Sequence, residues 1–128
     1  PIHIEHAFNV IRPFRRTKWV KENLIQEPQL LREGPGWKEF VIADRREFFH
    51  VVYRLEFHER AEDDTAGFFH ILTLVEGESV IIRSLEDADK CIPMRYSETV
   101  IIPACLGAYE IVNQAVGACK VVKSRLRY

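Results

Sequence analysis

The side chains best suited to chemistry gather in one short stretch of this sequence, from residue 50 to residue 58. His50, Arg54, Glu56 and His58 are spaced by two or four positions. Residues at even spacing share one face of a β-strand, so these four would bring imidazole, guanidinium and carboxylate groups together. Such a cluster could bind a sugar phosphate or a metal ion. We favour the simpler interpretation, a solvated outer face on which surface charges pair only weakly.

Three other positions carry groups that can bind a metal or move a proton. His70 lies in an apolar segment, and if it points inward it needs a hydrogen-bond partner. We interpret it as a core histidine with satisfied hydrogen bonds rather than as a ligand. Asp63 and Asp64 fall in a segment that we interpret as a loop, where paired carboxylates could hold calcium weakly. The ligand spacing of a known calcium loop is missing, so turn solvation explains them.

A basic and aromatic run lies near the start of the chain. It contains Arg12, Arg15, Arg16 and Lys18, with Phe14 and Trp19 between them. The whole chain nevertheless has 18 Lys and Arg against 19 Asp and Glu, so it lacks the net field that holds a nucleic acid or an anionic membrane. We expect neither partner. The run is better interpreted as a contact with another domain of the same protein, since Arg and Trp are enriched at interface centres.

The cysteines and the apolar runs bear on the compartment. Cys91, Cys105 and Cys119 form an odd set without any Cys-x-x-Cys spacing, which argues against a disulfide framework and a zinc knuckle. We expect buried free thiols, because free Cys packs as a small hydrophobic residue. No apolar run is long enough to span a bilayer, and we recognise no secretory signal. The expected location is the cytoplasm.

The elements that must position these residues are mostly strands. A length of 128 residues with 47% hydrophobic and 29% charged residues fits one globular domain with one core. Residues 1–36 lack strand alternation, and Pro13 and Pro28 interrupt any long helix. We expect residues 1–36 to be an irregular lead-in, with at most a helical turn or two, that packs on the rest. Residues 37–128, which follow the turn at 34–36, form the main domain.

Short runs rich in Val, Ile, Phe and Tyr predict strands throughout that domain. The clearest is 49–57, where apolar odd positions alternate with polar even ones, as in a strand with one buried face. Residues 68–75 are apolar on both faces and predict a central strand that is covered on both sides. Further strands are expected at 79–82, 92–96, 99–102, 108–112 and 119–124. This pattern predicts an all-β sandwich, barrel or jelly roll.

Together these stretches resemble a known family. Residues 67–77 resemble the first motif of cupins, and residues 98–104 resemble the second. Residues 103–111, with the pattern Pro-Ala-x-x-Gly-x-Tyr-x-Ile, are similar to the carboxy-terminal cupin of type I mannose-6-phosphate isomerases. Residues 2–11 are similar to the stretch by which those enzymes enter that cupin. The resemblance implies a cupin double-stranded β-helix, or jelly roll, and it covers the whole chain, although residues 14–36 contribute little to it.

The family interconverts mannose 6-phosphate and fructose 6-phosphate by moving a proton between adjacent carbons, with a zinc ion that polarises the sugar oxygens. Its zinc ligands and acid-base residues come from the preceding, catalytic cupin. The resemblance therefore implies no catalytic, cofactor-binding or metal-binding residue in this chain, and no cofactor of its own. Whether the chain alone has any enzyme activity stays open at this point.

Counting positions in the first motif supports a domain without metal. A metal-binding cupin has a His-x-His pair ahead of a Glu that lies seven residues before the closing Gly. With Gly77 as that Gly, His70 stands in the Glu position and residues 63–66 stand where the His-x-His pair should be. The motif therefore has no imidazole pair.

The second motif departs from the metal-binding pattern as well. Counting from Pro103, Cys105 stands at the expected Gly, Ala108 at the expected His, and Ser97 at the opening Gly. With both halves of the ligand set missing, we expect no zinc site of the usual cupin type.

Three functions follow as hypotheses. The first is a metal-free accessory domain that packs against an upstream catalytic cupin of the same protein and stabilises the enzyme or a homodimer. The second is a cupin that binds or senses a sugar or similar small molecule without chemistry. The third and least favoured is a free-standing metal cupin that uses His50, His58 and His70. Aromatic residues that could line a pocket or simply fill the core are Phe49, Tyr53, Phe57, Phe69 and Tyr109.

Overall fold

The chain folds into a β-sandwich, preceded by two short helices. The computed structural model describes residues 2–87 and 89–127. Its elements, in chain order, are α1 Ile4–Val10, α2 Thr17–Asn23, β1 Gln29–Gly34, β2 Trp37–Ala43, β3 His50–Phe57, β4 Arg60–Asp64, β5 His70–Glu76, β6 Ser79–Ser84, β7 Cys91–Arg95, β8 Thr99–Ile102, the 3-10 helix η1 Ala104–Leu106, β9 Ala108–Asn113 and β10 Cys119–Leu126. The predicted all-β class is confirmed.

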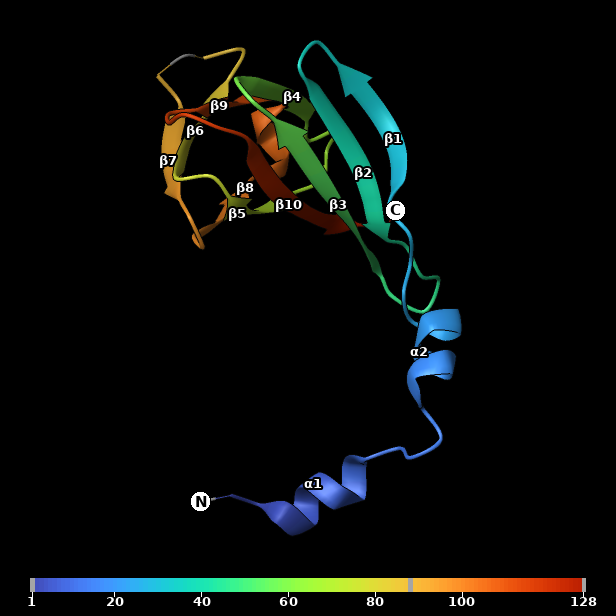
Figure 1. Cartoon of the computed structure of the whole chain (residues 1–128). Helices are drawn as coiled ribbons and strands as arrows, with labels where there is room; N and C mark the ends of the chain where they lie inside the picture. The colour runs from blue at the N-terminus through green and yellow to red at the C-terminus, as the bar shows by residue number, and fades with distance from the viewer. Residues whose placement is uncertain (1, 88, 128) are drawn as a thin grey trace.

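The strands form two sheets that face each other (Figure 1). The larger sheet has the order β1-β2-β3-β10-β5-β8, and the smaller has the order β4-β9-β6-β7. Neighbouring strands run antiparallel in every pair. Strands that are distant in sequence are therefore adjacent in space, and β10 near the end of the chain lies between β3 and β5.

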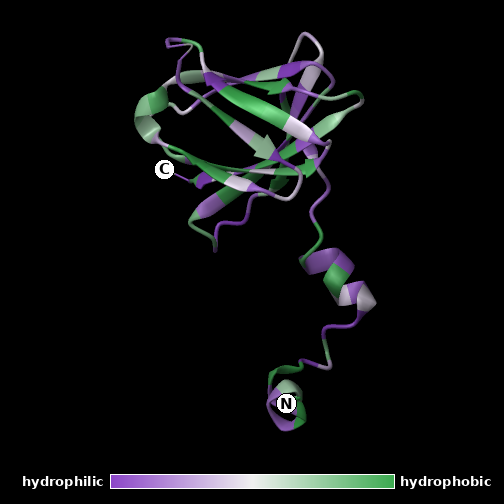
Figure 2. Ribbon diagram, turned by 90° about the vertical axis from the view of Figure 1, so that its left-hand side faces the viewer, coloured by the Kyte–Doolittle hydropathy of each residue, from purple (hydrophilic) through white to green (hydrophobic). Residues whose placement is uncertain are grey.

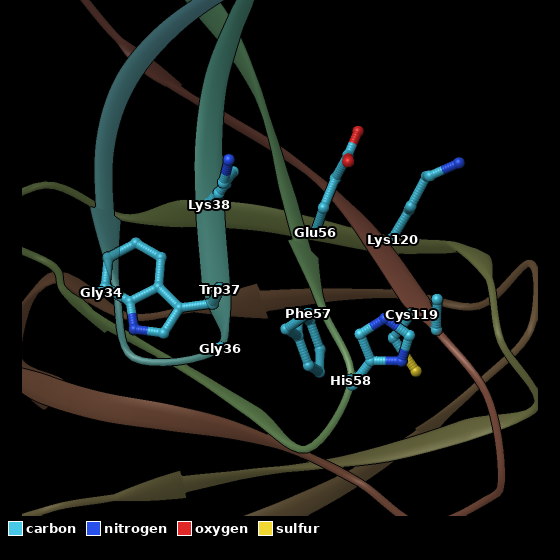
Figure 3. A pocket seen from close by; sticks show the side chains of 10 residues that line it. Gly34, Gly36, Trp37, Lys38, Glu56, Phe57, His58, Cys119 and Lys120 are labelled. Carbon is cyan, nitrogen blue, oxygen red and sulfur yellow. The ribbon is translucent and has the colours of Figure 1, made fainter.

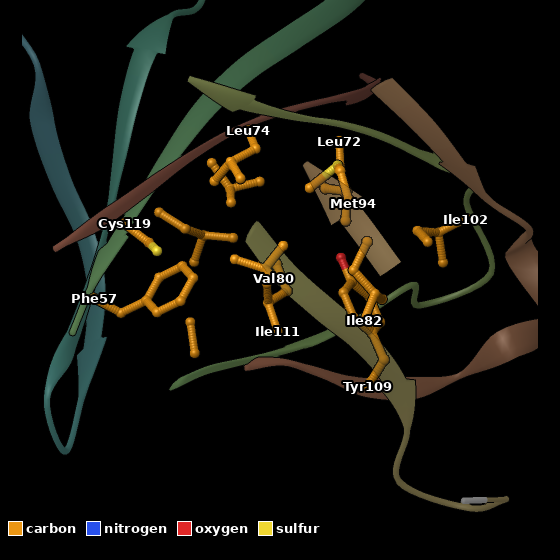
Figure 4. Close-up of a cluster of buried hydrophobic side chains, with 13 residues drawn as sticks. Phe57, Leu72, Leu74, Val80, Ile82, Met94, Ile102, Tyr109, Ile111 and Cys119 are labelled. Atoms are coloured by element: carbon orange, nitrogen blue, oxygen red, sulfur yellow. The ribbon is translucent and has the colours of Figure 1, made fainter. Parts of the chain in front are cut away.

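The core fills the space between the two sheets (Figure 4). Alternate residues of each strand point inward, as the period of two requires: Leu55 on β3, Leu72 on β5 and Val121 on β10 are fully buried. They meet Ile82 and Ile111 from the smaller sheet. Each such side chain contributes about 1.5–3 kcal/mol through burial. Along the strands of the sandwich, Figure 2 shows green, apolar segments beside purple, hydrophilic ones.

The predicted strands are found with small shifts at their ends, but two predictions about their faces need correction. Phe49 lies just outside β3 and is 66% exposed, and Phe69 is also exposed. The remaining three of the predicted aromatic residues, Tyr53, Phe57 and Tyr109, are buried. The strand β5 is covered on one side only, because Ile71 and Thr73 lie on the half-exposed outer face of the larger sheet.

The lead-in differs from the expectation in two ways. Its last part is the strand β1, which pairs with β2, so the boundary after residue 36 falls at the turn of a β-hairpin. Its first part forms α1 and α2, neither of which has a buried residue. Both helices extend away from the sandwich (Figure 1), and the expected packing of this part on the barrel is not observed. None of the helices in the described part of the chain is long and apolar enough to cross a membrane.

Candidate functional site

Four charged side chains from four strands meet inside the sandwich, and we call them the ionic network. Arg32 comes from β1, Glu39 from β2, Asp63 from β4 and Lys123 from β10. Three of them occupy inward positions: Lys123 follows Cys119 and Val121 on one face of β10, and Asp63 follows Ala61 on β4. On β2, β4 and β10 the alternation therefore carries a charge into the interior, whereas Arg32, whose side chain is 40% exposed, reaches these charges from β1.

Lys123 lies at the centre of the ionic network. Its Nζ atom is 2.5 Å from Glu39 Oε1 and 2.6 Å from Asp63 Oδ2. The Glu39 contact is an ion pair outside hydrogen-bond geometry, whereas Lys123 donates a hydrogen bond to Asp63. Arg32 donates from Nε to Glu39 and from Nη2 to Asp63. Two cations thus neutralise two carboxylates within the protein itself.

Burial makes these charges mutually dependent. The side chains of Glu39, Asp63 and Lys123 are almost fully buried, and a buried charge without a partner costs several kcal/mol. Burial opposes the ionisation of Asp63, but Lys123 and Arg32 outweigh it and hold the pKa of that carboxyl below its ordinary value. Asp63 is therefore ionised at neutral pH.

A tyrosine and a histidine extend the ionic network. The Tyr109 hydroxyl lies 3.0 Å from Asp63 Oδ2, and His70 Nδ1 lies 2.8 Å from the Tyr109 hydroxyl. Burial lowers the pKa of His70 to about 4, even though the Asp63 carboxylate opposes this shift. His70 is therefore neutral at pH 7. Its other nitrogen, Nε2, is buried without a hydrogen-bond partner among the described residues.

A cavity of about 190 Å³, here called the polar cavity, opens onto the ionic network. Arg125 reaches it from β10, two residues beyond Lys123. Its Nε atom donates to the Tyr53 hydroxyl at 3.3 Å, and its guanidinium lies over the ring of Phe68. The residues that line the cavity are Leu31, Arg32, Glu39, Tyr53, Asp63, Asp64, His70, Lys123 and Arg125.

A second, larger cavity of about 300 Å³ lies where β1–β2, β3 and β10 meet (Figure 3). Trp37, Phe57 and Cys119 give it a mainly apolar lining. The neighbouring Lys38, Glu56 and Lys120 alternate with them along three paired strands. Burial raises the pKa of the Cys119 thiol, so this cavity holds no activated nucleophile. The polar cavity is therefore the better candidate for a functional site.

The ionic network does not fit a divalent metal ion such as zinc. Zinc in proteins takes His, Cys and carboxylate ligands around one centre, but cations of the chain already bind both carboxylates, Glu39 and Asp63. Among the described residues, one imidazole, that of His70, lies within ion-pair distance of these carboxylates. Within the described residues, no group of three His, Cys, Asp or Glu side chains could hold a metal.

Of the residues that the sequence placed on one strand face, His50, Arg54 and Glu56 lie on the outer side of β3. Arg54 Nη2 pairs with Glu56 Oε1 at 2.7 Å, in agreement with the solvated-face interpretation. His50 begins β3 and packs against Phe48 and Phe49, whereas His58 follows its far end and lines the second cavity.

The hypothesis of a metal site made by three histidines is therefore wrong. Eight strand positions separate His50 from His58, which corresponds to about 26 Å at roughly 3.3 Å per residue. His70 lies inside the sandwich and the other two lie outside it. The three imidazoles cannot reach one ion.

The interpretation of Asp63 and Asp64 as loop residues is also wrong. Both belong to β4, and Asp63 is buried in the ionic network rather than solvated in a turn. Sequence analysis missed Glu39 and Lys123 altogether. A usable signal was present, because Lys123 lies on the same strand face as the apolar residues Cys119 and Val121, and a charge carried inward in this way needs a buried partner.

The prediction that His70 is a core histidine with satisfied hydrogen bonds is confirmed only in part. Nδ1 is hydrogen-bonded, whereas Nε2 has no hydrogen-bond partner among the described residues. The three cysteines are free, as expected, but only Cys119 is buried, and Cys91 and Cys105 are exposed. The basic and aromatic run is exposed as well, with the Arg15 guanidinium 4.8 Å from the centre of the Trp19 ring.

Comparisons with known proteins identify the fold. No family model matches the sequence, and no curated protein sequence matches it. Among solved structures, a cupin-2 domain from Rhodospirillum rubrum superposes with a TM-score of 0.61 at 11% identity, over 79% of this chain and 70% of that one. A cupin 2 conserved barrel domain protein from Rhodopseudomonas palustris gives 0.60 at 7% identity, over 80% and 72%.

The mannose 6-phosphate isomerase from Bacillus subtilis gives a TM-score of 0.64 at 19% identity. The similarity covers 97% of this chain but only 34% of the isomerase, so the chain spans about a third of that enzyme. At such low identities these structures show the fold alone. The chain has the cupin jelly-roll fold, and the resemblance to cupins is confirmed at that level.

Proposed function

We propose that this chain is a metal-free accessory cupin domain of a mannose-6-phosphate isomerase-like protein. In this role it packs against a preceding catalytic cupin, in the cytoplasm, and stabilises the enzyme without taking part in the interconversion of mannose 6-phosphate and fructose 6-phosphate. The similarity over 97% of the chain to one third of the Bacillus subtilis isomerase supports this role.

One observation carries the proposal: the Lys123 ammonium pairs with both buried carboxylates, Glu39 and Asp63, that a metal ion would need as ligands. Asp63, one of the residues 63–66 where the His-x-His pair is missing, is buried beside His70 at the motif's Glu position, with 3.6 Å between His70 Nδ1 and Asp63 Oδ2. Lys123 neutralises Asp63 at that place. An ammonium cannot act as the Lewis acid that polarises a sugar oxygen. The arrangement favours structural stabilisation over isomerisation.

The exposed lead-in supports a contact with another domain. Single exposed apolar residues are common, but a contiguous series of them marks an interaction surface. The residues before β1 that are large, apolar and exposed are Ile2, Ile4, Phe8, Val10, Ile11, Phe14, Leu24 and Ile25. A preceding catalytic cupin would cover this series and would also contact the basic run around Arg15.

Elemental analysis tests the absence of a metal. The purified chain is dialysed against zinc and then against buffer, with a chelator-treated sample as the blank. We expect a zinc-to-protein ratio near zero, because Arg32 and Lys123 compete for both carboxylates. A ratio near one would overturn the proposal.

An isomerase assay tests the accessory role. The chain alone should not convert mannose 6-phosphate. A catalytic cupin expressed without its carboxy-terminal domain should unfold at a higher temperature when this chain is added. Conversion by the isolated chain, or no effect on a catalytic cupin from the same protein, would contradict the accessory role.

A further inference from the structure

The strand β5 is apolar on both faces, although only one of them is covered. Residues 68–75 have the pattern of a strand that is buried on both sides. In the structure, however, Ile71 lies half-exposed on the outer face of the larger sheet. An antiparallel sheet with one solvated face ordinarily carries polar residues there. The apolar outer face of β5 therefore indicates that another part of the assembled protein covers it.

The strands on either side of β5 extend the apolar surface. Ser124 of β10 pairs with Ile71 of β5 and with Val52 of β3, and Ile71 pairs with Ile101 of the edge strand β8. A cavity of about 250 Å³, here called the outer cavity, hollows this surface. We call the apolar residues that line the cavity or belong to this row the outer patch: Phe49, Val52, Phe69, Ile71, Ile101 and Leu126.

The outer patch is accessible, and its backbone is firmly held. Phe49, Phe69 and Ile101 are 66%, 38% and 69% exposed. Arg127 fixes the loop that carries Phe49, because its backbone amide donates to the Phe49 carbonyl at 2.9 Å and its Nε atom donates to the Phe48 carbonyl at 3.0 Å. A partner therefore meets a surface that is already ordered, which lowers the entropy cost of binding.

The lead-in joins the sandwich next to the outer patch. The Gln26 side chain accepts a hydrogen bond from the Asp44 amide at 2.8 Å and donates one to the Asp44 carbonyl at 3.2 Å. Asp44 begins the loop between β2 and β3, and Phe49 ends it. Figure 1 shows the lead-in meeting the sandwich at this loop. The exposed apolar series of the lead-in, whose last members are Leu24 and Ile25, thus ends beside the loop that carries Phe49.

This connection selects the domain that precedes the lead-in as the occupant. A flexible tether raises the effective concentration of a linked domain to about the millimolar range, so this domain reaches the outer patch more readily than a free partner does. A second copy of the chain fits less well. A two-fold contact brings the same patch of both copies together, so the two outer cavities would face each other and stay unfilled, whereas protein interiors are closely packed.

We propose that the outer patch is the docking surface of the preceding domain, which inserts a protruding apolar side chain into the outer cavity. The inference rests on the proposed function and deepens it, since it places the contact on the larger sheet as well as on the lead-in. Four residues along β10 from Ser124, Lys120 lies in a charged row with Glu56 and Glu76. This row bounds the apolar contact on one side, as a polar rim does at other protein interfaces.

Hydroxyl-radical footprinting with mass spectrometry tests the proposal, because it measures how fast exposed aromatic side chains are oxidised. The isolated chain 1–128 is compared with the intact protein that contains the preceding domain. In the intact protein, we expect the oxidation of Phe49 and Phe69 to fall towards that of the buried Tyr109. Tyr96 is the control, because it is exposed and lies beyond the opposite end of β5, where its amide donates to the Glu78 carbonyl. Its oxidation should stay the same.

The lead-in reports on the proposed function in the same experiment, through the exposed Phe14. Protection of Phe14 without protection of Phe49 and Phe69 would overturn the docking surface but leave the contact of the lead-in intact. Reactivity of all three in the intact protein would contradict both. If Phe49 and Phe69 become protected in the isolated chain as its concentration rises, the occupant is a second copy and the proposal is wrong.

Two variants of the intact protein test the contact itself. Ile101→Lys places a charge in the outer patch and should weaken docking at least about tenfold, because the burial of an isoleucine is lost. The oxidation of Phe49 and Phe69 should rise accordingly. Val116→Lys is the matched control, because Val116 is fully exposed in the loop at the other end of β10. It should leave both residues protected, and equal oxidation of Phe49 in the two variants would overturn the docking surface.

Discussion

Lys123 shows how a single residue can decide whether the interior of a barrel is able to bind a metal ion. In a metal-binding barrel, the residue at this inward position would have to leave the carboxylates free to bind the metal ion. Here the ammonium binds Glu39 and Asp63 at 2.5 and 2.6 Å, and it also lies 5.0 Å from the centre of the Tyr53 ring. The interior is thereby stabilised by ion pairing, a role that requires every charge to keep its partner.

Replacement of Lys123 by Met should show this dependence. Lys123→Met removes the central cation and leaves two buried carboxylates that Arg32 alone must neutralise. We expect a loss of about 3–5 kcal/mol in the free energy of unfolding, the usual effect of breaking a buried ion pair, measured by urea denaturation. Lys120→Met, on the exposed side of the same strand, should cost less than about 1 kcal/mol. Equal effects of the two substitutions would show that the ionic network is not stabilising.

His70 predicts how stability depends on pH. Burial lowers its pKa from 6.5 to about 4, so between these values the unfolded chain binds a proton that the folded chain does not. Stability should therefore fall as the pH decreases from 6.5 to about 4, by an amount on the order of 3 kcal/mol. Asp63 adds to the loss only below its ordinary pKa of 3.8.

Urea denaturation at several pH values between 7 and 4 measures this slope. In His70→Gln, which has no imidazole at this position, the slope over that range should be smaller. The amide can still donate to Tyr109, so the variant keeps the hydrogen bond that His70 makes. If the slope is unchanged in His70→Gln, other groups are responsible for the pH dependence.

At the scale of elements, the β1–β2 hairpin matters most for the site. It contributes Arg32 and Glu39 to the ionic network, and its turn brings Trp37 over Gly34, where a side-chain β-carbon would lie only 2.5 Å from the Trp37 Nε1 atom. Glycine at this position therefore permits close packing of the indole on β1. The helices α1 and α2, by contrast, contribute no residue to the core or to the polar cavity.

Two truncated chains test whether the β1–β2 hairpin contributes more to stability than the helices α1 and α2. Removal of residues 1–25 takes away both helices but keeps Gln26, which bonds to the backbone of Asp44. We expect the free energy of unfolding to change by less than about 1 kcal/mol, because neither helix has a buried residue. Removal of residues 1–35 also takes away β1 and Arg32, and should cost at least about 2–3 kcal/mol more, since two charged hydrogen bonds disappear. Similar stabilities of both truncated chains would mean that β1 is dispensable.

At the scale of the whole molecule, an apolar and basic lead-in extends from a folded sandwich (Figure 2). Exposed apolar surface favours association, and in the proposed role a preceding domain covers it. Without that domain, the chain 1–128 should self-associate with increasing concentration, whereas a chain without residues 1–25 should stay monomeric. Light scattering coupled to size-exclusion chromatography measures both masses. Monomers in both cases would argue against the lead-in as an interface and against a homodimer formed through it.

The sequence alone was sufficient for the fold class and for most of the strands. Strand formers in alternation predict an all-β domain, because burial of one sheet face requires a period of two, and residues 50–57 form the strand that their pattern indicates. The cupin motifs led to the correct jelly-roll fold. The strands β1, β2 and β4 escaped prediction, and only a helical turn or two was expected where α1 and α2 form, since short segments with many charged residues carry weak periodicity.

Only the tertiary structure decided which charged residues belong together. Arg32, Glu39, Asp63 and Lys123 are separated by up to 91 positions in the sequence, and each alone is typical of a protein surface. Their strands lie in two sheets, and the arrangement of those strands determines that the buried Glu39, Asp63 and Lys123 meet one another and the partly exposed Arg32. The free Nε2 of His70 has the same origin, because a hydrogen-bond partner depends on atoms that only the fold brings near. Local sequence patterns predict strands, whereas partners for buried charges follow from packing between strands.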